Sequence, residues 1–428
     1  MRVTVIGAGY VGLTSALTFA AVGHEVVCVE REPARRGALL RREDPLGEPG
    51  VAELLRETRA RFVEADRELD RANVILVAVG TPMRRDGHAD LRQIDDVARE
   101  LAREARPGTV VAIRSTVPVG TCDRLQAGVL RHQLVVSNPE FLREGHAVTD
   151  SFTPTRVVAG GPLPARATIE ALYAPLRRAS RDVPLIWTTS RSAELAKYAA
   201  NGFLATKLSF VNEIANLADV VGADADVVLR TMALDPRIGA GHLRPGLGWG
   251  GSCFPKDTRA LAALAAGEGY DFIVLRAAIE QNNRQLSRFA RIVERETPEG
   301  GTIGLLGLAF KAGTADTRES PALALARRLA RRGRRVNAYD PAVRSVDDGA
   351  IRVERDAFAA CTDADAVVVA TEWPEFADLD LCALRRVARG DLLVDGRAII
   401  HPARAGAAGF RYRRIGAAVL PTRAAAGS

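Results

Sequence analysis

The chain has 428 residues, of which 47% are hydrophobic and 26% are charged. Such a length suits two or three domains rather than one core, and the composition is that of a globular protein, not a disordered or membrane one. The formal net charge of +7 comes from scattered basic residues without interleaved aromatics, so we expect solvated faces and no nucleic-acid partner.

The five cysteines form neither a CxxC pair nor a cluster with histidine at metal-ligand spacing, so we expect no metal site and no disulfide framework. A glycine-rich turn interrupts the apolar N-terminus where a secretory signal would have a continuous apolar core. Uncharged apolar runs long enough to span a membrane, about 18 residues, are absent from the sequence. We expect a cytoplasmic protein without a membrane partner.

The first thirty residues predict a strand at 3–6, a glycine turn, a helix at 13–21 and a second strand at 25–29. Apolar β-branched runs predict further strands at 74–79, 110–113 and 134–136. Helix-like stretches separate these runs, as a parallel sheet covered on both faces requires. We assign residues 1–185 to a Rossmann-like domain.

From 191 to 221 the pattern is helical and apolar nearly all round, which predicts a long helix buried on most sides, including against a second subunit. Asn201-Gly202 is a turn signal within this stretch, but helix formers on both sides favour an unbroken helix. We assign residues 186–298 to a central helical domain and expect a homodimer or a higher homo-oligomer.

A second alternation begins near Thr302, with a strand at 302–306, a helix at 322–332, a strand at 335–339 and another at 366–371. We assign residues 299–428 to a second Rossmann-like domain. The predicted fold is therefore α/β: two Rossmann-like doubly wound parallel-sheet domains joined by a central helical domain with one long helix.

A GxGxxG turn and an acidic residue mark a dinucleotide site in the first domain. The first glycine makes the tight turn, the second admits a pyrophosphate, and the third lets the helix pack on the strand. Glu30, which ends the next strand, would accept from ribose hydroxyls and favours NAD over NADP, whereas the neighbouring Arg31 and Arg35 pull the other way. The predicted cofactor contacts here are Gly7, Gly9, Tyr10, Val11, Gly12, Glu30 and Arg35.

The segment GGSCFPKD, which begins at Gly250, predicts a reactive cysteine. Pro255 suits the first turn of a helix, so Cys253 would lie at the helix start, where the dipole and Lys256 favour a thiolate. Asp257, one turn further on, can act as a base or hold a water molecule. The alternative is a buried cysteine that merely begins a helix.

Two further groups of polar residues are candidates for the site. Lys197 and Asn201 are four apart on the long helix, so they point the same way and can donate jointly to an oxygen that gains negative charge. A solvated lysine and a surface amide are an equal alternative. Ser115-Thr116 and the segment 138–145 follow predicted strands, where ligand loops of open sheets gather, although helix capping would also explain Glu144.

The chain closely resembles the UDP-glucose/GDP-mannose dehydrogenase family through motifs that run in the same order over nearly its whole length. They are GAGYVG at Gly7, VGTP before Met83, STVPVGT at Ser115, NPEFLREG at Asn138, ELAKYAANGFLA at Glu194, RIG at Arg237, GGSCFPKD at Gly250, GLAFKAGTADTRESPAL at Gly307, YDP at Tyr339, TEW at Thr371 and DGR at Asp395. Within the family, STVPVGT, KYAAN and RIG look more like the UDP-glucose branch than the GDP-mannose branch.

The resemblance implies a four-electron, NAD-dependent oxidation of a nucleotide sugar, UDP-glucose first of all, through a thiohemiacetal and a thioester on Cys253. The implied catalytic set is Cys253, Lys197, Asn201, Asp257, Glu140 and Thr116. Implied cofactor contacts are Thr81, Pro82, Ser115, Thr116, Glu144, Lys256 and Arg318. Implied sugar-nucleotide contacts are Glu140, Phe141, Leu142, Arg143, Lys197, Asn201, Arg237, His242, Gly250, Lys311 and Arg397, with Arg237 reaching across from a neighbouring subunit.

Three alternatives remain open at this point. The sugar nucleotide could be GDP-mannose or a UDP-N-acetylhexosamine, because His242 takes an aromatic position of the family's sugar-binding loop. A two-electron hydroxyacid dehydrogenase of the 6-phosphogluconate type shares the Lys-x-x-x-Asn helix but needs no cysteine. A non-catalytic NAD-binding protein needs no thiolate beside an aspartate and a lysine.

Overall fold

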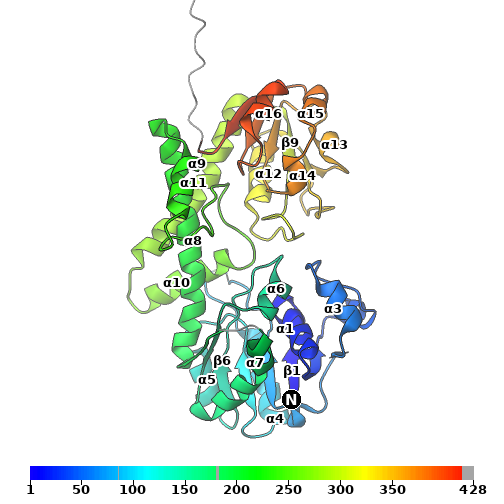
Figure 1. Cartoon of the computed structure of the whole chain (residues 1–428), viewed down its shortest axis with the longest axis vertical. Coiled ribbons are helices and arrows are strands. Elements are labelled where there is room, and N and C mark those ends of the chain that lie inside the picture. Colours follow the sequence, from blue (N-terminus) through cyan, green and yellow to red (C-terminus); the bar gives the residue numbers. More distant parts are fainter. Residues whose placement is uncertain (85, 180–182, 417–428) are drawn as a thin grey trace, which may run out of the picture. The chain divides into compact units, whose positions relative to one another are not determined.

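The structure is a computed structural model that describes residues 1–84, 86–179 and 183–416. It divides into two compact units, the first made of Met1–Asn201 with Arg259–Asp271 and the second of Gly202–Thr258 with Phe272–Ser428. Each unit contains one sheet flanked by helices (Figure 1). The division into three domains at 185 and 298 stays a prediction.

An eight-stranded sheet in the order β3-β2-β1-β4-β5-β6-β7-β8 forms the centre of the first unit. Its strands are β1 Arg2–Ile6, β2 Glu25–Val29, β3 Arg61–Val63, β4 Val74–Val77, β5 Val110–Ile113, β6 Leu134–Ser137, β7 Val157–Gly160 and β8 Leu185–Thr188. The first six strands are parallel. β7 pairs antiparallel with β6 through Ser137 and Gly160, so the prediction of a parallel sheet is wrong for this pair. The apolar run alone could not give the direction, because the preceding connection sets it.

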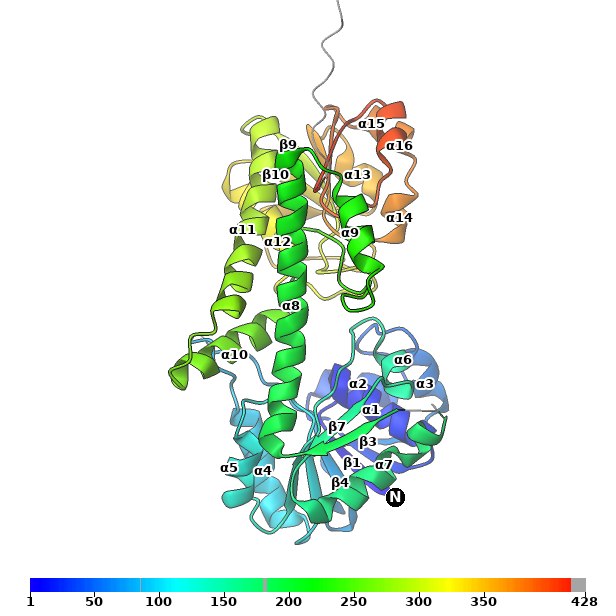
Figure 2. The ribbon, with the colours of Figure 1, turned by 60° about the vertical axis from the view of Figure 1, so that its left-hand side comes forward.

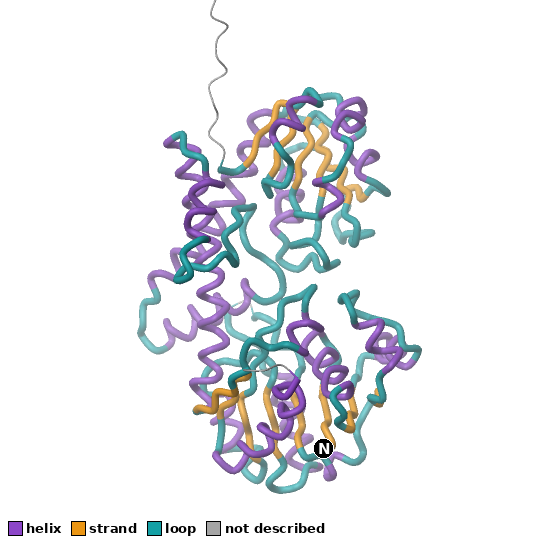
Figure 3. Tube along the Cα trace, in the orientation of Figure 1, coloured by secondary structure: helices purple, strands orange, loops and turns teal. Residues whose placement is uncertain are grey.

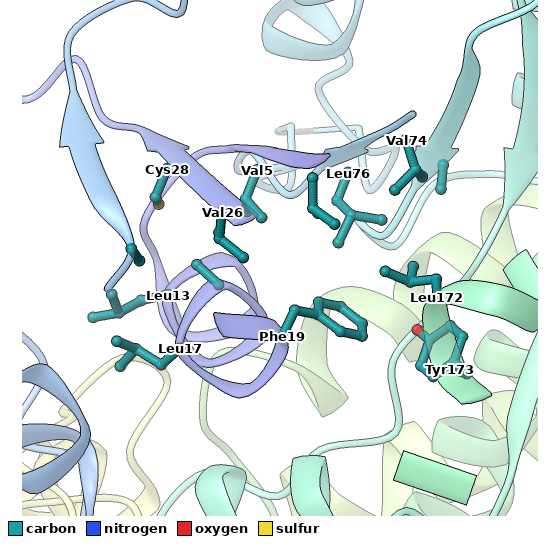
Figure 4. Close-up of a cluster of buried hydrophobic side chains, with 14 of the residues drawn as sticks. Val5, Leu13, Leu17, Phe19, Val26, Cys28, Val74, Leu76, Leu172 and Tyr173 are labelled. Atoms are coloured by element: carbon teal, nitrogen blue, oxygen red, sulfur yellow. The ribbon is translucent and has the colours of Figure 1, made fainter. Parts of the chain in front are cut away.

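Helices cover both faces of this sheet, which confirms the doubly wound arrangement. They are α1 Tyr10–Ala21, α2 Pro33–Leu40, α3 Val51–Glu57, α4 Arg92–Glu104, α5 Thr121–Ala127, α6 Ala147–Phe152 and α7 Arg166–Ala179, with 3₁₀ turns at Leu69–Arg71 and Leu163–Ala165. Alternate residues of β4 serve the two faces: Val74 and Leu76 pack with α1 and α7, whereas Ile75 and Val77 pack with α4 and α5. Figure 4 shows the first of these clusters, with Leu13, Leu17 and Phe19 of α1 beside the strands.

The local sequence rules gave most of these boundaries. The strands predicted at 25–29 and 110–113 have those limits, whereas the strand predicted at 74–79 ends at Val77. The helix predicted from Leu13 begins three residues earlier, at Tyr10, directly after Gly9. The glycine turn therefore leads straight into the helix.

A six-stranded parallel sheet in the order β11-β10-β9-β12-β13-β14 forms the centre of the second unit. Its strands are β9 Thr302–Leu306, β10 Arg335–Tyr339, β11 Ile351–Val353, β12 Ala366–Val369, β13 Leu392–Asp395 and β14 Arg411–Arg414. The helices around it are α11 Ile273–Glu296, α12 Pro321–Arg331, α13 Ala357–Cys361, α14 Pro374–Ala377, α15 Leu381–Val387 and α16 Pro402–Ala407. α11 and α12 cover one face and α13 to α16 cover the other, as the strands and helices in Figure 3 illustrate.

The predicted long helix is α8, which runs unbroken from Ser190 to Val221 through Asn201 and Gly202 (Figure 2). It is followed by α9 Ala225–Ala233 and α10 Phe254–Gly267. One face of α8 is buried in the chain, but Phe203, Phe210 and Leu217 are 70%, 53% and 54% exposed. Among the described residues, no helix is long and apolar enough to cross a membrane.

Candidate active site

The glycine turn between β1 and α1 has the geometry of a phosphate cradle. Gly7 has a φ of +97°, and a Cβ on Gly12 would lie 1.8 Å from the carbonyl oxygen of Gly7. A Cβ on Gly9 would meet no atom of the described residues within 4 Å. Gly9 is the N-cap of α1 and has no side chain to accept from the first N–H groups of that helix. These residues fit the pyrophosphate of a dinucleotide.

Glu30 lies beside this turn, where the sequence placed it, and is buried. Its Oε2 atom accepts the N–H of Ala8 at 3.0 Å and a guanidinium hydrogen bond from Arg35 at 3.0 Å, while Oε1 accepts the N–H of Glu32 at 2.8 Å. A carboxylate has about four acceptor sites, so three bonds leave room for a ribose hydroxyl. Arg35 is thus an ion-pair partner of Glu30.

Two loops that follow β4 and β5 are hydrogen-bonded to one another. The Thr81 hydroxyl donates to the carbonyl of Thr116 at 2.9 Å, and the Ser115 hydroxyl donates to the carbonyl of Val79 at 2.7 Å. Thr81, Ser115 and Thr116 therefore lie together at the carboxyl edge of the sheet, where ligands of open α/β sheets bind. Pro82 follows Thr81 and is exposed.

The loop after β6 carries a buried ion pair. Nζ of Lys197 lies 2.9 Å from Oε1 of Glu140, and the N–H of Leu142 donates to Oε2 at 2.5 Å. Burial raises the pKa of the Glu140 carboxyl. The charge and hydrogen bond of Lys197, together with the Leu142 N–H, lower this pKa by more than burial raises it. The net pKa lies below its usual value, so Glu140 is ionised at neutral pH and can hold a water molecule by accepting from it.

Other predicted residues of this loop have definite neighbours. The Phe141 ring lies 3.8 Å from the guanidinium carbon of Arg156 and 5.5 Å from Nζ of Lys197, so two cations face one aromatic ring. Arg143 forms a bidentate pair with Asp150 of α6, with distances of 2.6 and 2.9 Å. Glu144 is half-buried, and Asn201 is buried one turn after Lys197 on α8.

Sequence reasoning missed the polar residues that support this loop. Buried Arg114 donates to the Asn138 side chain at 3.1 Å and to the Tyr173 hydroxyl at 2.6 Å. Asn138 in turn donates to the carbonyl of Val158 at 2.8 Å. Arg114 directly follows β5, and a charged residue at a strand end is the signal that could have indicated it.

A second missed residue fixes the loop that holds Thr116. Glu194, one turn before Lys197 on α8, is buried and accepts the N–H groups of Gly120 at 2.7 Å and Cys122 at 2.8 Å. Burial raises the pKa of the Glu194 carboxyl. One face of α8 thus positions the loops after both β5 and β6.

In the second unit, Cys253 begins α10 as predicted. Its carbonyl oxygen accepts the N–H of Asp257 at 2.9 Å, the first bond of the helix, and the residue is exposed. Asp257 is buried and its Oδ1 atom lies 2.5 Å from Nζ of Lys256, a pairing that the sequence did not suggest. Lys256 therefore neutralises Asp257 rather than acting on the thiol alone. That Cys253 acts together with Lys197 and Asn201 of the first unit stays a prediction.

The other cysteines differ from Cys253. Burial raises the pKa of the thiols of Cys28, Cys122 and Cys361, which disfavours their thiolates. Cys382 is exposed on α15, but the carboxylate of Asp380 already caps that helix by accepting from the N–H of Ala383. Cys253 is therefore both exposed and placed at the start of a helix, and both features favour it as the nucleophile.

Glycines bring the cysteine loop against the second sheet. A Cβ on Gly250 would lie 2.1 Å from the carbonyl oxygen of Glu319, and one on Gly251 would lie 2.7 Å from the Phe310 ring. Both positions therefore exclude any side chain. Gly250, which was predicted to contact the substrate, has this packing role as well.

Arg397 connects the loops at the carboxyl edge of the second sheet. Its guanidinium donates to the carbonyls of Phe310 at 3.1 Å and Ala370 at 3.0 Å, and it pairs with Glu372 at 3.0 Å. Asp395, at the end of β13, accepts the Arg397 N–H at 2.9 Å. Nζ of Lys311 lies 5.5 Å from the Phe310 ring centre. The loops after β9, β12 and β13 thus meet around one cation.

The remaining predicted residues of the second unit are exposed. Arg318 pairs with Asp316 at 2.7 Å and Arg237 pairs with Asp235 at 2.6 Å. His242 has a φ of +60°, and its ring centre lies 6.3 Å from that of Phe254 at the start of α10. The ligand roles of Arg318, Arg237 and His242 stay predictions.

Comparison with known proteins assigns the chain to a family. Three segments match the UDP-glucose/GDP-mannose dehydrogenase family: its NAD binding domain at residues 1–177, its central domain at 191–284 and its UDP binding domain at 304–402. The chain belongs to this family. It is therefore an NAD-dependent oxidoreductase, and the glycine turn between β1 and α1 lies within the segment that matches the NAD binding domain.

Relatives match over nearly the whole length. A UDP-glucose 6-dehydrogenase of Pseudomonas aeruginosa is 43% identical over 97% of both chains, and one of Bacillus subtilis is 40% identical over 99% of both. The structure of a UDP-glucose dehydrogenase from Pyrobaculum islandicum superimposes with a TM-score of 0.89 and 35% identity, covering 97% of this chain and 98% of that one. A UDP-D-ManNAc dehydrogenase from Pyrococcus horikoshii gives 0.85 at 28% identity, covering 97% and 99%.

Proposed function

We propose that this enzyme oxidises UDP-glucose to UDP-glucuronate with two molecules of NAD, through a thioester on Cys253. The observation that carries the proposal is the exposed Cys253 at the first turn of α10, beside the Lys256–Asp257 pair. The names of the most similar relatives support UDP-glucose as the substrate. A thiolate that captures the aldehyde gives a covalent intermediate for the second oxidation, whereas a two-electron dehydrogenase has no use for one.

The cofactor would be held by the glycine turn, the N-terminus of α1 and Glu30. Bound NAD supplies the hydride acceptor for each of the two oxidations. Glu30 would accept from the ribose hydroxyls and disfavour a 2′-phosphate, while Arg35 keeps the carboxylate in place by pairing with it.

In the first half of the reaction, Asp257 holds the proton that leaves the C6 hydroxyl as the alcohol becomes an aldehyde. The thiolate of Cys253 then attacks the aldehyde carbon, a C–S bond forms, and the carbonyl oxygen takes up a proton to give a thiohemiacetal. Loss of a second hydride and of that proton leaves the thioester. Asp257 lies one helical turn from Cys253 and is held in place by Lys256, which supports its role as the base.

In the second half, water attacks the thioester carbon and releases its two protons to solvent, the C–S bond breaks, and the thiolate of Cys253 is freed together with the uronate carboxylate. Glu140, held ionised by Lys197, would orient this water together with Thr116. Lys197 and Asn201 would stabilise the oxyanions that form on the sugar.

The test is to count the NADH formed per sugar and to compare two cysteine variants. We expect two NADH per UDP-glucose, and we expect Cys253→Ala to lower uronate formation by roughly a thousandfold or more. Cys382→Ala, an exposed and free thiol on α15, is the control and should leave the rate unchanged. One NADH per sugar, or near-normal turnover by Cys253→Ala, would refute the thioester.

A UDP-N-acetylhexosamine is the second candidate substrate, which the resemblance to the Pyrococcus horikoshii structure favours. A panel of UDP- and GDP-sugars, followed at the nicotinamide absorbance, separates the two. The highest kcat/KM on an N-acetylhexosamine would replace UDP-glucose as the substrate while leaving the chemistry on Cys253 intact.

We also propose a homodimer formed through α8. Phe203, Phe210 and Leu217 recur every seven residues, which puts three exposed apolar side chains on one stripe of the helix. A second copy of the same stripe would cover them. Sedimentation of the enzyme should give a dimer or a multiple of it, and Phe210→Lys should shift the equilibrium toward the monomer.

The buried free thiols are compatible with a reducing compartment, and we propose the cytoplasm.

A further inference from the structure

The motif Glu48-Pro49-Gly50 has no part in the functions assigned so far, yet its glutamate is 3% exposed. Oε2 of Glu48 accepts the N–H of Gly145 at 2.8 Å, and Oε1 accepts the N–H of Ala147 at 2.7 Å. Burying a carboxylate is costly unless hydrogen bonds compensate it, and here each oxygen has a backbone donor.

Both N–H groups close the loop that holds the Glu140–Lys197 ion pair. This loop leaves β6 at Asn138, carries Glu140 and Glu144, and ends where α6 begins at Ala147. His146, the N-cap residue of α6, does not itself cap the helix. Glu48 supplies that cap from a distant part of the chain.

The two ends of the loop are held by different means. At the start, the Asn138 side chain accepts from Arg114 at 3.1 Å and donates to the carbonyl of Val158 at 2.8 Å. At the end, Glu48 holds Gly145 and Ala147. Without Glu48 the end of the loop would keep the pair between Arg143 and Asp150 of α6 but would lose its link to residues 46–50.

The segment that carries Glu48 also contacts the cofactor turn. The Tyr10 hydroxyl, at the start of α1, donates to the carbonyl of Leu46 at 3.3 Å. Gly50 has a φ of +86°, and a Cβ there would lie 3.3 Å from the Val148 side chain of α6. Residues 46–50 thus touch both the first residue of α1 and the first turn of α6.

We propose that Glu48 is a positioning residue, which fixes the loop of Glu140 and Glu144 against the dinucleotide turn so that sugar and cofactor bind in register. The inference rests on the proposed function. Glu48 acts through the backbone of Gly145 and Ala147, to which its carboxylate is hydrogen-bonded. Both carboxylate oxygens are needed, because an amide would turn its NH₂ group toward one of the two N–H donors.

The test is Glu48→Gln, which keeps size and shape but removes one acceptor. We expect kcat/KM for the nucleotide sugar to fall at least tenfold, NAD to bind at least tenfold more weakly, and the amides of Gly145 and Ala147 to exchange faster with solvent. Glu48→Asp should not rescue activity, because the shorter side chain cannot reach both amides. The control is Glu53→Gln on α3, whose exposed carboxylate pairs with Arg56 at 3.2 Å and should leave all three measurements unchanged.

Loss of thermal stability with kcat/KM per folded enzyme within twofold of wild type would overturn the inference. If Glu48→Gln fails to fold, amide exchange in the wild-type enzyme decides, because fast exchange at Gly145 and Ala147 contradicts the inference and slow exchange supports it. If the wild type makes no uronate, the proposed function fails, and NAD affinity alone then decides. Glu48→Gln that binds NAD as the wild type does would refute the role of Glu48.

Discussion

Both sheets of the molecule make the same turn after their first strand. Gly7 follows β1 with a φ of +97°, and Gly307 follows β9 with a φ of +108°. The next positions differ, because Gly9 of the first turn corresponds to Ala309 in the second. The helix begins directly after Gly9 in the first unit, whereas in the second α12 begins only at Pro321. One turn therefore presents a helix N-terminus and the other a long loop.

The two helix ends also differ in what satisfies them. Gly9 leaves the first N–H groups of α1 without a side-chain cap. In the second unit, the Ser320 hydroxyl accepts the N–H of Leu323 at 3.2 Å and donates to the carbonyl of Leu308 at 2.7 Å. In the second unit, Ser320 thus accepts from the helix N-terminus, which is the position where a phosphate binds in a dinucleotide fold.

The acidic residue after the second strand of each sheet shows the same contrast. Glu30 accepts three hydrogen bonds, whereas Asp340 accepts five, from the N–H groups of Leu308, Ala309, Ala342 and Val343 and from the Trp373 indole. A saturated carboxylate holds the fold together and has no capacity for a ligand. One topology therefore carries two kinds of acidic residue, one with capacity for a ligand and one without.

Two alanine substitutions in the first turn should separate folding from cofactor binding. Gly12→Ala puts a Cβ 1.8 Å from a backbone oxygen that cannot move away, so we expect loss of NAD binding and a strongly lowered Tm. Gly9→Ala meets open space and has a φ of −75°, so the protein should fold normally, but its methyl should weaken NAD binding at least tenfold, about 1.4 kcal/mol. Calorimetric titration and thermal unfolding measure both.

The control is Gly406→Ala on α16, where a Cβ would also meet no described atom within 4 Å. It should change neither NAD affinity nor, to any large extent, the Tm. Gly9→Ala that binds NAD with wild-type affinity would mean that the open space beside Gly9 is not the cofactor cradle.

Substitution of the two acidic residues, Asp340 and Glu30, should give smaller effects, the first mainly on stability and the second mainly on NAD affinity. Asp340→Asn leaves about two buried N–H donors facing an amide NH₂ group, so we expect a loss of about 2–6 kcal/mol in the free energy of unfolding, with NAD affinity unchanged. Glu30→Gln should weaken NAD binding more than it destabilises the fold. Urea unfolding and NAD titration of both variants test this. If both substitutions changed NAD affinity equally, Glu30 would not be specific to cofactor binding, nor Asp340 to stability.

The features that the sequence predicted well are governed by local rules. The glycine turn, the limits of β2 and β5, and the unbroken helix through Asn201-Gly202 depend on residue conformations and on hydrophobic period. The position of Cys253 at the start of α10 followed from Pro255 alone. Each of these features involves residues within a few positions of one another.

The features that it did not predict depend on contacts between distant segments. Lys197 and Glu140 were each singled out, but nothing in the sequence indicated that they form a pair. The bond of Glu48 to Gly145 and the support of Asn138 by Arg114 likewise arise only once the sheet is assembled. The pairing of Lys256 with Asp257 was missed for another reason, because adjacent residues in a helix do not ordinarily share a face.

The Glu140–Lys197 pair should produce the smallest effect, visible as a pH dependence of stability. Because the folded-state pKa of Glu140 is depressed, its ionisation stabilises the fold above the unfolded pKa of about 4.3, and this contribution is lost as pH falls through the lower folded pKa. Wild type should therefore exceed Glu140→Gln in Tm by a constant margin near neutrality and by a narrowing margin below about pH 4.3. Glu53→Gln, which removes an exposed carboxylate, should show no such trend. A margin that widened on acidification would mean that burial outweighs Lys197, so that Glu140 enters the fold protonated and would donate to the water it is proposed to orient.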